Sequence, residues 1–206
     1  MKKLFVLVVC VVMGVSAFAQ KEEKKAIKQV FDTYMKSAKA RQADEAIKCL
    51  SQSTIDYYSE LLTLCKADSA TLISRPSFDV VMTLAIKART DASVLCAMNS
   101  GEELLRHAFL EGMVSPEKQS FGEVVINGDT AIVTDDNAAY QFVKENAVWK
   151  FDLFYSTAQL STRFDSAIQE YKVTKPEFCV AMVVRMFGNG ILLQDSKKIW
   201  NSVCEY

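Results

Sequence analysis

The chain has 206 residues, of which half are hydrophobic, and its 24 basic and 25 acidic residues give a formal net charge of −1. This length is sufficient for one domain with a full hydrophobic core. A sequence pI of about 5.9 argues against the basic surface of a nucleic-acid-binding protein, so no nucleic-acid partner is expected.

The first nineteen residues have the pattern of an export signal. Lys2 and Lys3 precede an uncharged apolar run over 4–15, and Ala17-Phe18-Ala19 supplies the small-x-small pattern that signal peptidase recognises. Cleavage after this motif predicts a mature chain that begins at Gln20. The expected location is therefore exported, either periplasmic or extracellular.

Two alternatives to cleavage are an uncleaved anchor and a lipid attached at Cys10. The apolar run is shorter than the roughly 20 residues that a membrane-spanning helix needs. Val8 and Val9 stand where small residues would precede a lipidated cysteine. We therefore expect no stable membrane insertion after signal cleavage.

The mature chain keeps an odd number of cysteines and contains no CxxC pair. Cys49, Cys65, Cys96 and Cys179 stand among apolar neighbours, where a free cysteine behaves as a small buried hydrophobe. Export also permits disulfides. If one bridge forms, proximity in the sequence favours Cys49–Cys65, and at least one thiol stays unpaired in the monomer.

The chain after the signal is predicted to begin with helices. Residues 22–41 carry an apolar stripe at helical spacing, and a shorter helix is expected over 43–50. The residues of the stripe are Ile27, Val30, Phe31, Tyr34, Met35 and Ala38.

Three further helix starts are indicated by local signals. Ser53 and Asp56 have the spacing of a capping box, and Ser100 with Glu103 repeats it. Pro76 is expected in the first turn of a helix between them, where its missing N–H does no harm.

Residues 121–155 are predicted to form two hairpins. Strands over 121–126 and 130–134 flank an Asn-Gly-Asp turn, and strands over 139–144 and 148–155 flank a turn at Glu145-Asn146. In the last strand Trp149, Phe151, Leu153 and Tyr155 alternate with Lys150 and Asp152. One face of the sheet should therefore be apolar and the other mixed.

Helical spacing returns after Ser156, and a last helix follows Pro176 and should stop at the glycines of 188–190. The predicted fold class is α+β: N-terminal helices packed on a curved four-strand antiparallel meander, with additional C-terminal helices. We expect a single domain over 20–206, with a core of about 22–155 and a C-terminal helical extension over 156–206.

Two segments carry a resemblance to a known family. The sequence NGDTAIV at 127–133 and FVKENAVWKFDL at 142–153, after a long first helix, resemble the nuclear-transport-factor-two-like superfamily of cystatin-like α+β rolls. The similarity covers about residues 22–155 and is closest to small secreted members of unknown function. It implies a sheet that wraps against helices as a cone, which some members use as a ligand pocket or active site.

Residues that could carry acid–base chemistry are few. His107, the only histidine, stands four residues from both Glu103 and Glu111, which predicts a position on the charged, solvated face of its helix. A Cys96/His107 dyad lacks any motif context, and Asp152 is the best carboxylate candidate but is expected to be exposed or ion-paired. No catalytic residue, metal site or cofactor is predicted.

Large aromatic residues with polar tips are better candidates for ligand contacts. The predicted ligand-binding residues are Tyr34, Tyr58, Tyr140, Trp149 and Tyr155. The competing interpretation is that these rings form ordinary core with their polar atoms satisfied at its edge.

The sequence therefore favours an exported, non-enzymatic binding or interaction module whose partner is a small molecule or a protein not identified by any motif. Association as a homodimer is compatible with this prediction. The alternative is an enzyme of the polyketide-cyclase or isomerase type that uses a cone-shaped pocket. A hollow cone would favour ligand binding, whereas a closed cone with an exposed apolar patch would favour an interaction protein.

Overall fold

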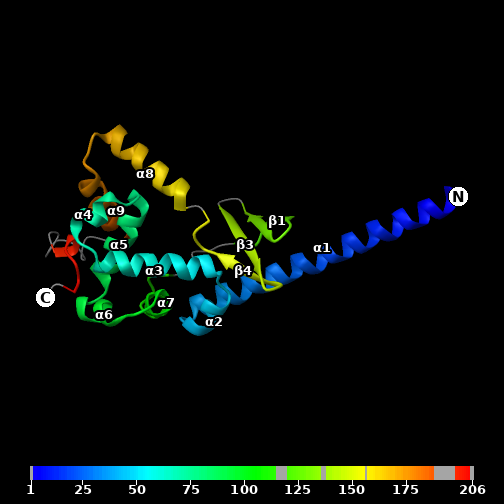
Figure 1. Ribbon diagram of the computed structural model, residues 1–206, viewed down its shortest axis with the longest axis horizontal. Coiled ribbons are helices and arrows are strands. Elements are labelled where there is room, and N and C mark those ends of the chain that lie inside the picture. Colours follow the sequence, from blue (N-terminus) through cyan, green and yellow to red (C-terminus); the bar gives the residue numbers. More distant parts are fainter. Residues whose placement is uncertain (1, 115–119, 136–137, 156, 188–197, 205–206) are drawn as a thin grey trace. The chain divides into compact units, whose positions relative to one another are not determined.

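The computed structural model describes the backbone of residues 2–114, 120–135, 138–155, 157–187 and 198–204 (Figure 1). Side chains are described within these ranges from Gln20 onward, apart from Phe187 and Lys198. Of the export signal expected over 1–19, only the backbone of residues 2–19 is described, and the glycine stop expected at 188–190 lies outside the described residues.

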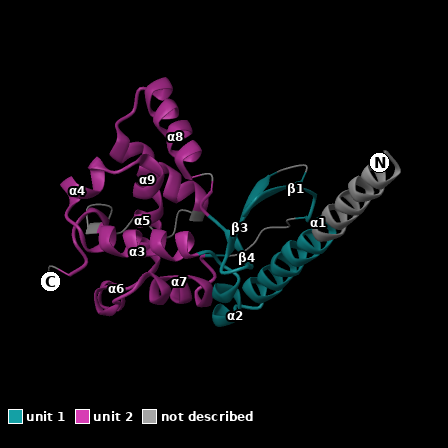
Figure 2. Ribbon diagram, turned by 45° about the vertical axis from the view of Figure 1, so that its right-hand side comes forward, with its two compact units in different colours: residues 1–51, 114–153 teal, residues 52–113, 154–206 magenta. Residues whose placement is uncertain are grey.

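The chain forms two compact units, shown in separate colours in Figure 2. Unit 1 comprises residues 1–51 and 114–153, and unit 2 comprises residues 52–113 and 154–206. The expectation of one domain over 20–206 remains a prediction, because a compact unit need not fold independently. The boundaries do differ from the expected core and extension, since the helices of 52–113 group with the C-terminal helices.

Unit 1 combines two helices with a four-strand antiparallel sheet in the order β1-β2-β3-β4. The helices are α1 (Lys2–Lys39) and α2 (Ala43–Lys48), and the strands are β1 (Glu123–Asn127), β2 (Thr130–Thr134), β3 (Ala139–Glu145) and β4 (Val148–Asp152). With the helices of unit 2 on either side of it in the sequence, this sheet confirms the predicted α+β class.

Both hairpin turns contain residues with a positive φ. Gly128 has φ of 60° at the first loop position between β1 and β2, where glycine costs least. Asn146 and Ala147 have φ of 50° and 65° in the two-residue loop between β3 and β4. Two positive φ values are typical of a primed turn. The turn therefore lies at Asn146-Ala147, one residue later than the expected Glu145-Asn146.

Aromatic rings fill the space between α1 and the sheet. Phe31 and Tyr34 of α1 are both less than 5% exposed and contact Phe151, at centroid distances of 6.4 and 4.9 Å. Phe151 also stacks on its cross-strand neighbour Phe142 at 4.8 Å. The predicted stripe of the first helix is therefore correct, although Val30 and Met35 are only half-buried.

The segment after α2 extends the sheet at its β4 edge. Leu50 forms a parallel bridge with Phe151. The Phe151 N–H donates to the Cys49 carbonyl at 2.7 Å, and the Ser51 N–H donates to the Phe151 carbonyl at 3.0 Å. These bonds hold the end of α2 against the strand that carries Trp149.

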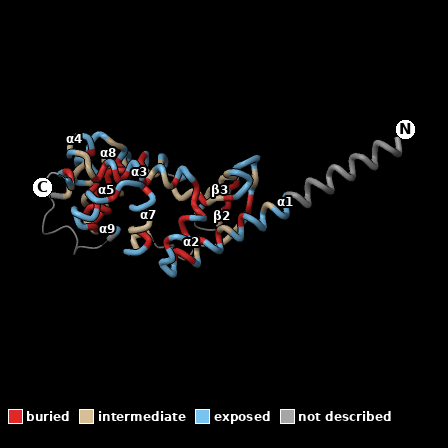
Figure 3. Tube along the Cα trace, turned by 60° about the horizontal axis from the view of Figure 1, so that its bottom comes forward, coloured by how far each residue is buried: buried red, intermediate tan, exposed pale blue. Residues whose placement is uncertain are grey.

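Unit 2 is helical in its described part. Its elements are α3 (Gln52–Lys66), α4 (Ser69–Ser74), α5 (Ser77–Arg89), α6 (Ala92–Ala97), α7 (Gly101–Leu110), α8 (Thr157–Tyr171), α9 (Lys175–Phe187) and the 3₁₀ turn η1 (Lys198–Trp200). Helix α5 is buried over almost all of its circumference (Figure 3), whereas α8 buries only Ser161. The sequence predicted only one apolar face for α5. Local spacing could not predict that α9, about 90 residues further along the chain, would pack on another face.

Of the three predicted helix starts, the cap at Ser100 is confirmed and the other two are displaced along the chain. Ser100 caps α7 as predicted, since its hydroxyl accepts from the Glu103 N–H at 3.2 Å while Glu103 accepts from the Asn99 N–H at 2.8 Å. The capping box at Ser53 is wrong, because α3 already begins at Gln52. Pro76 stands one residue before its helix, at the N-cap of α5.

The disulfide joins Cys96 to Cys204, with Cα atoms 5.4 Å apart and a sequence separation of 108. The predicted Cys49–Cys65 pair is wrong, and Cys49, Cys65 and Cys179 are free and buried as the alternative interpretation had it. That interpretation is wrong for Cys96, which is exposed and disulfide-bonded. The C-terminal segment reaches α3, where Ser202 Oγ donates to the Lys66 carbonyl at 2.7 Å and the Val203 N–H donates to the Cys65 carbonyl at 3.3 Å. This docking brings Cys204 to Cys96.

From Gln20 onward, where side chains are described, none of the helices combines the length and apolar character required to span a membrane.

Candidate functional site

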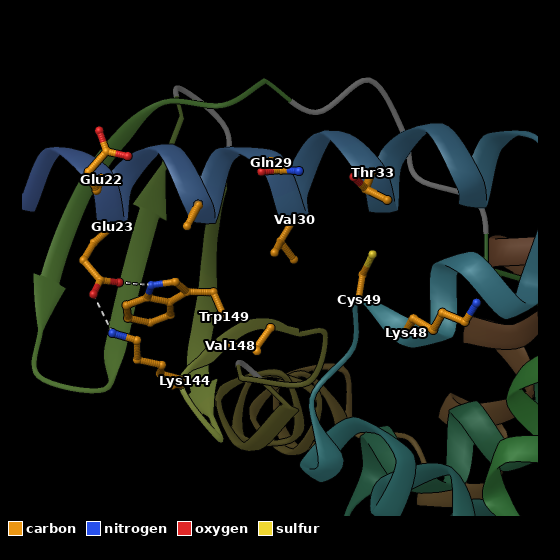
Figure 4. A pocket seen from close by; sticks show the side chains of 12 residues that line it. Glu22, Glu23, Gln29, Val30, Thr33, Lys48, Cys49, Lys144, Val148 and Trp149 are labelled. Atoms are coloured by element: carbon orange, nitrogen blue, oxygen red, sulfur yellow. Dashed lines mark hydrogen bonds and ion pairs between the residues drawn. The ribbon is translucent and has the colours of Figure 1, made fainter.

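A groove of about 600 Å³ lies in unit 1 between α1, the end of α2 and the β3–β4 hairpin (Figure 4). On α1 it is lined by Ala26, Val30 and Thr33, which recur at helical spacing beside the buried row. On the hairpin it is lined by the loop residue Ala147 and by Val148.

One end of the groove is closed by a polar cluster of three side chains. Lys144 Nζ lies 2.5 Å from Glu23 Oε1, and Trp149 Nε1 donates to Glu23 Oε2. Lys144 and Trp149 are directly opposite each other on β3 and β4, and the ammonium lies 5.3 Å from the indole centroid. A two-residue loop therefore places a cation and an N–H donor beside one glutamate of α1.

The electrostatics of this cluster favour an ionised glutamate. The hydrogen bond from Lys144 and then the one from Trp149 lower the pKa of the Glu23 carboxyl from its usual value near 4.5. The cluster has one negative and one positive charge, so it is balanced internally. Its opposite charges link α1 to the hairpin.

The other end of the groove carries Lys48 and Cys49. The Cys49 thiol donates to the Glu45 carbonyl at 3.4 Å, and burial raises its pKa. A raised pKa favours the protonated thiol near neutral pH. Lys48 Nζ pairs with Glu45 Oε1 at 2.7 Å on the exposed surface.

Three of the five predicted ligand-binding residues belong to unit 1, and they have different surroundings. Trp149 lines the groove. Tyr34 packs edge-on against Phe151 in the core. Tyr140 is half-buried, with its ring 6.0 Å from that of Phe151, and burial followed by the nearby Asp135 raises the pKa of its hydroxyl.

The other two predicted residues belong to unit 2. Tyr58 is 2% exposed and contacts Phe154 edge-on at 5.6 Å, and its burial raises the pKa of its hydroxyl. Tyr155 is 44% exposed and follows the end of β4, so it does not share the inward alternation of Trp149 and Phe151. The chain leaves the sheet at Asp152, which is why the predicted alternation ends there.

The candidates for acid–base chemistry, His107, Cys96 and Asp152, have surroundings that differ from those expected or that involve them in other contacts. His107 is half-buried rather than solvated, and its Nε2 lies 3.2 Å from Thr90 Oγ1 at the end of α5. Cys96 is bonded to Cys204, which eliminates the Cys96/His107 dyad. Asp152 is half-buried at the end of β4, and Lys150 on the same face donates to the Lys48 carbonyl.

Sequence reasoning missed Glu23 and Lys144. The register of the second hairpin could have indicated Lys144, because a loop one residue later pairs it with Trp149. Glu23 belongs to a mixed run of charges at the start of the mature chain, and no local pattern distinguishes it from Glu22.

The chain matches no protein-family model, and it shows no match to a curated protein or to a solved structure. The resemblance to the nuclear-transport-factor-two-like superfamily therefore stays a prediction.

Proposed function

We propose that the protein is an exported, non-enzymatic binding module whose groove in unit 1 takes an elongated apolar molecule with a neutral polar end. The observation that carries this proposal is the apolar stretch of Ala26, Val30, Ala147 and Val148 beside the polar cluster of Glu23, Lys144 and Trp149; Glu22, Gln29, Thr33, Lys48 and Cys49 complete the lining. Ligand pockets commonly combine a mainly apolar lining with a few polar groups that set orientation.

The apolar stretch supports an apolar ligand body. Val148 is 54% exposed although it is a β-branched residue on a strand, and Val30 of α1, which points toward it in Figure 4, is half-buried. Covering these two side chains would remove apolar surface from water, at about 25 cal/mol for each Å².

The polar end supports a neutral ligand group. Because Glu23 and Lys144 balance each other, a charged ligand group would have to displace one partner of a 2.5 Å ion pair. A hydroxyl, amide or ester can instead hydrogen-bond beside the pair and leave it intact. The ligand class is therefore a long-chain alcohol, amide or ester in preference to a fatty acid.

Binding is favoured over the enzymatic alternative by the same cluster. A general base works best with a pKa near the working pH, whereas the hydrogen bonds of Glu23 lower its pKa. The buried Cys49 thiol has a raised pKa. Neither group has the properties that a cyclase or isomerase of the polyketide type would require of it.

Binding is tested with the neutral dye N-phenyl-1-naphthylamine and the chain from Gln20 onward. Val148→Glu introduces a charge in the groove, and Val125→Glu is its matched control, because Val125 is 60% exposed on β1 outside the groove. We expect saturable dye fluorescence with the wild type and V125E, and at least tenfold weaker binding with V148E. Equal binding by all three proteins would contradict the proposal.

Export is tested separately by mass spectrometry of the protein from its native host. We expect an N-terminus at Gln20 in the fraction outside the cytoplasm. Intact Met1 on soluble cytoplasmic protein would refute export while leaving the groove proposal unaffected.

A further inference from the structure

Unit 2 contains a second cavity, of about 680 Å³, which we call the α8 pocket. Its walls come from α3, from the junction of α4 and α5, from α8 and from the start of α9. Its ionisable lining residues in the described part of the chain are Glu60, Arg75, Asp79, Asp165 and Lys175, with Tyr57 beside them. Ten of its twelve described lining residues carry a hydroxyl or a charged group.

The deepest charged group of the α8 pocket is Asp79. It is 8% exposed and stands in the first turn of α5, where the helix dipole favours a negative charge. The Tyr57 hydroxyl donates to Asp79 Oδ1 at 2.9 Å. Burial raises the pKa of Tyr57, which keeps this donor protonated.

Asp79 has a neutral donor but no cationic partner among the described residues. Arg75 is engaged by Glu60, with Nη2 3.2 Å from Oε2. Lys175 Nζ donates to the Arg75 carbonyl, and Asp165 accepts from the Ser77 hydroxyl. A buried carboxylate is costly unless it is paired, and one hydroxyl compensates it only in part.

A charge count of the described lining residues gives the sign of the missing group. The pair of Glu60 and Arg75 is neutral, which leaves Asp79 and Asp165 against Lys175. One positive charge would balance the pocket. An organic cation fits better than a metal ion, because the described residues contain no cluster of three His, Cys, Asp or Glu side chains that could hold a metal.

Tyr57 adds a second feature suited to an organic cation. Tyr57 lines the pocket, and its ring packs against that of Phe154 at a centroid distance of 4.2 Å. An aromatic face next to a carboxylate attracts ammonium groups through the ring quadrupole as well as through charge. The packing on Phe154 fixes the orientation of the Tyr57 ring.

We propose that the α8 pocket binds a small organic molecule with one ammonium group, with the Asp79 carboxylate as its counter-ion and the Tyr57 ring as its aromatic wall. The α8 pocket and the groove in unit 1 share no lining residue. The α8 pocket gives the protein a second binding activity with a different ligand chemistry.

The test is an NMR titration of the ¹⁵N-labelled chain from Gln20 onward with benzylammonium, and with benzyl alcohol as the neutral probe of similar shape. We expect saturable shifts of the Ser77–Val80 amides with benzylammonium and none with benzyl alcohol. This comparison uses the wild type only, so it does not depend on a variant that folds. Saturable binding of both probes, or of neither, would overturn the proposal.

Two variants assign the binding to Asp79. Asp79→Asn removes the charge and keeps an acceptor for Tyr57, whereas Asp91→Asn removes an exposed charge at the N-cap of α6, outside the pocket. Benzylammonium should bind at least tenfold more weakly to D79N and unchanged to D91N. Equal affinity for folded D79N and wild type would overturn the role of Asp79.

Discussion

Replacing Trp149 by alanine should be among the most destabilising single changes in unit 1. The side chain is 3% exposed, so its removal leaves a large cavity between α1 and the hairpin. Truncation of a buried tryptophan costs about 3–5 kcal/mol. It also removes the indole donor of Glu23, and a hydrogen bond to a charged group contributes about 1.5–3 kcal/mol.

A series of variants separates these contributions. Trp149→Phe keeps a ring but loses the donor, so we expect it to cost about 2 kcal/mol, clearly less than Trp149→Ala. A double-mutant cycle of W149F with Glu23→Gln isolates the coupling of the two side chains, expected at about 1 kcal/mol. Lys150→Ala, on the opposite face of β4, should cost only about half a kcal/mol.

The assay is urea unfolding followed by far-UV circular dichroism, with equal slopes required before free energies are compared. Equal losses for W149A and K150A would show that the two faces of β4 are assigned wrongly. Equal losses for W149A and W149F would show that packing of the indole contributes nothing.

Three further outcomes follow from contacts elsewhere. Gly101→Ala should lower the Tm, because a Cβ there would lie closer than 3.0 Å to the Ser59 backbone. This clash should outweigh the roughly 1 kcal/mol better helix propensity of alanine. A higher Tm would contradict this packing. Cys204→Ser should destabilise unit 2 by about 2–4 kcal/mol in urea, and dithiothreitol should lower the stability of the wild type but not of this variant. Glu23→Gln should cost about 1 kcal/mol of unfolding free energy at pH 7. Because folding lowers the pKa of Glu23, the wild type is more stable than this variant above the usual glutamate range and loses that advantage as the pH falls through the lower folded pKa. A stability difference that persists unchanged to pH 3 would refute the ion pair.

The α+β class, both hairpins and the cap at Ser100 could be predicted from the sequence, because each depends on residues close together in the chain. Alternation on a strand, the spacing of a helical stripe and the φ preference of glycine act over two to eight residues. The inward positions of Phe31, Tyr34, Trp149 and Phe151 follow from such local rules, and they are all buried.

The disulfide, the burial of α5 and the two cavities were decided only by tertiary structure. Cys96 and Cys204 are 108 residues apart, and they meet because the C-terminal segment bonds to the end of α3. Glu23 meets Lys144 across 121 residues, and among the described residues Asp79 has no cationic partner because of what surrounds it after folding. Local propensity contains no information on such distances, since a side chain's partner depends on which elements pack together and not on its neighbours in sequence.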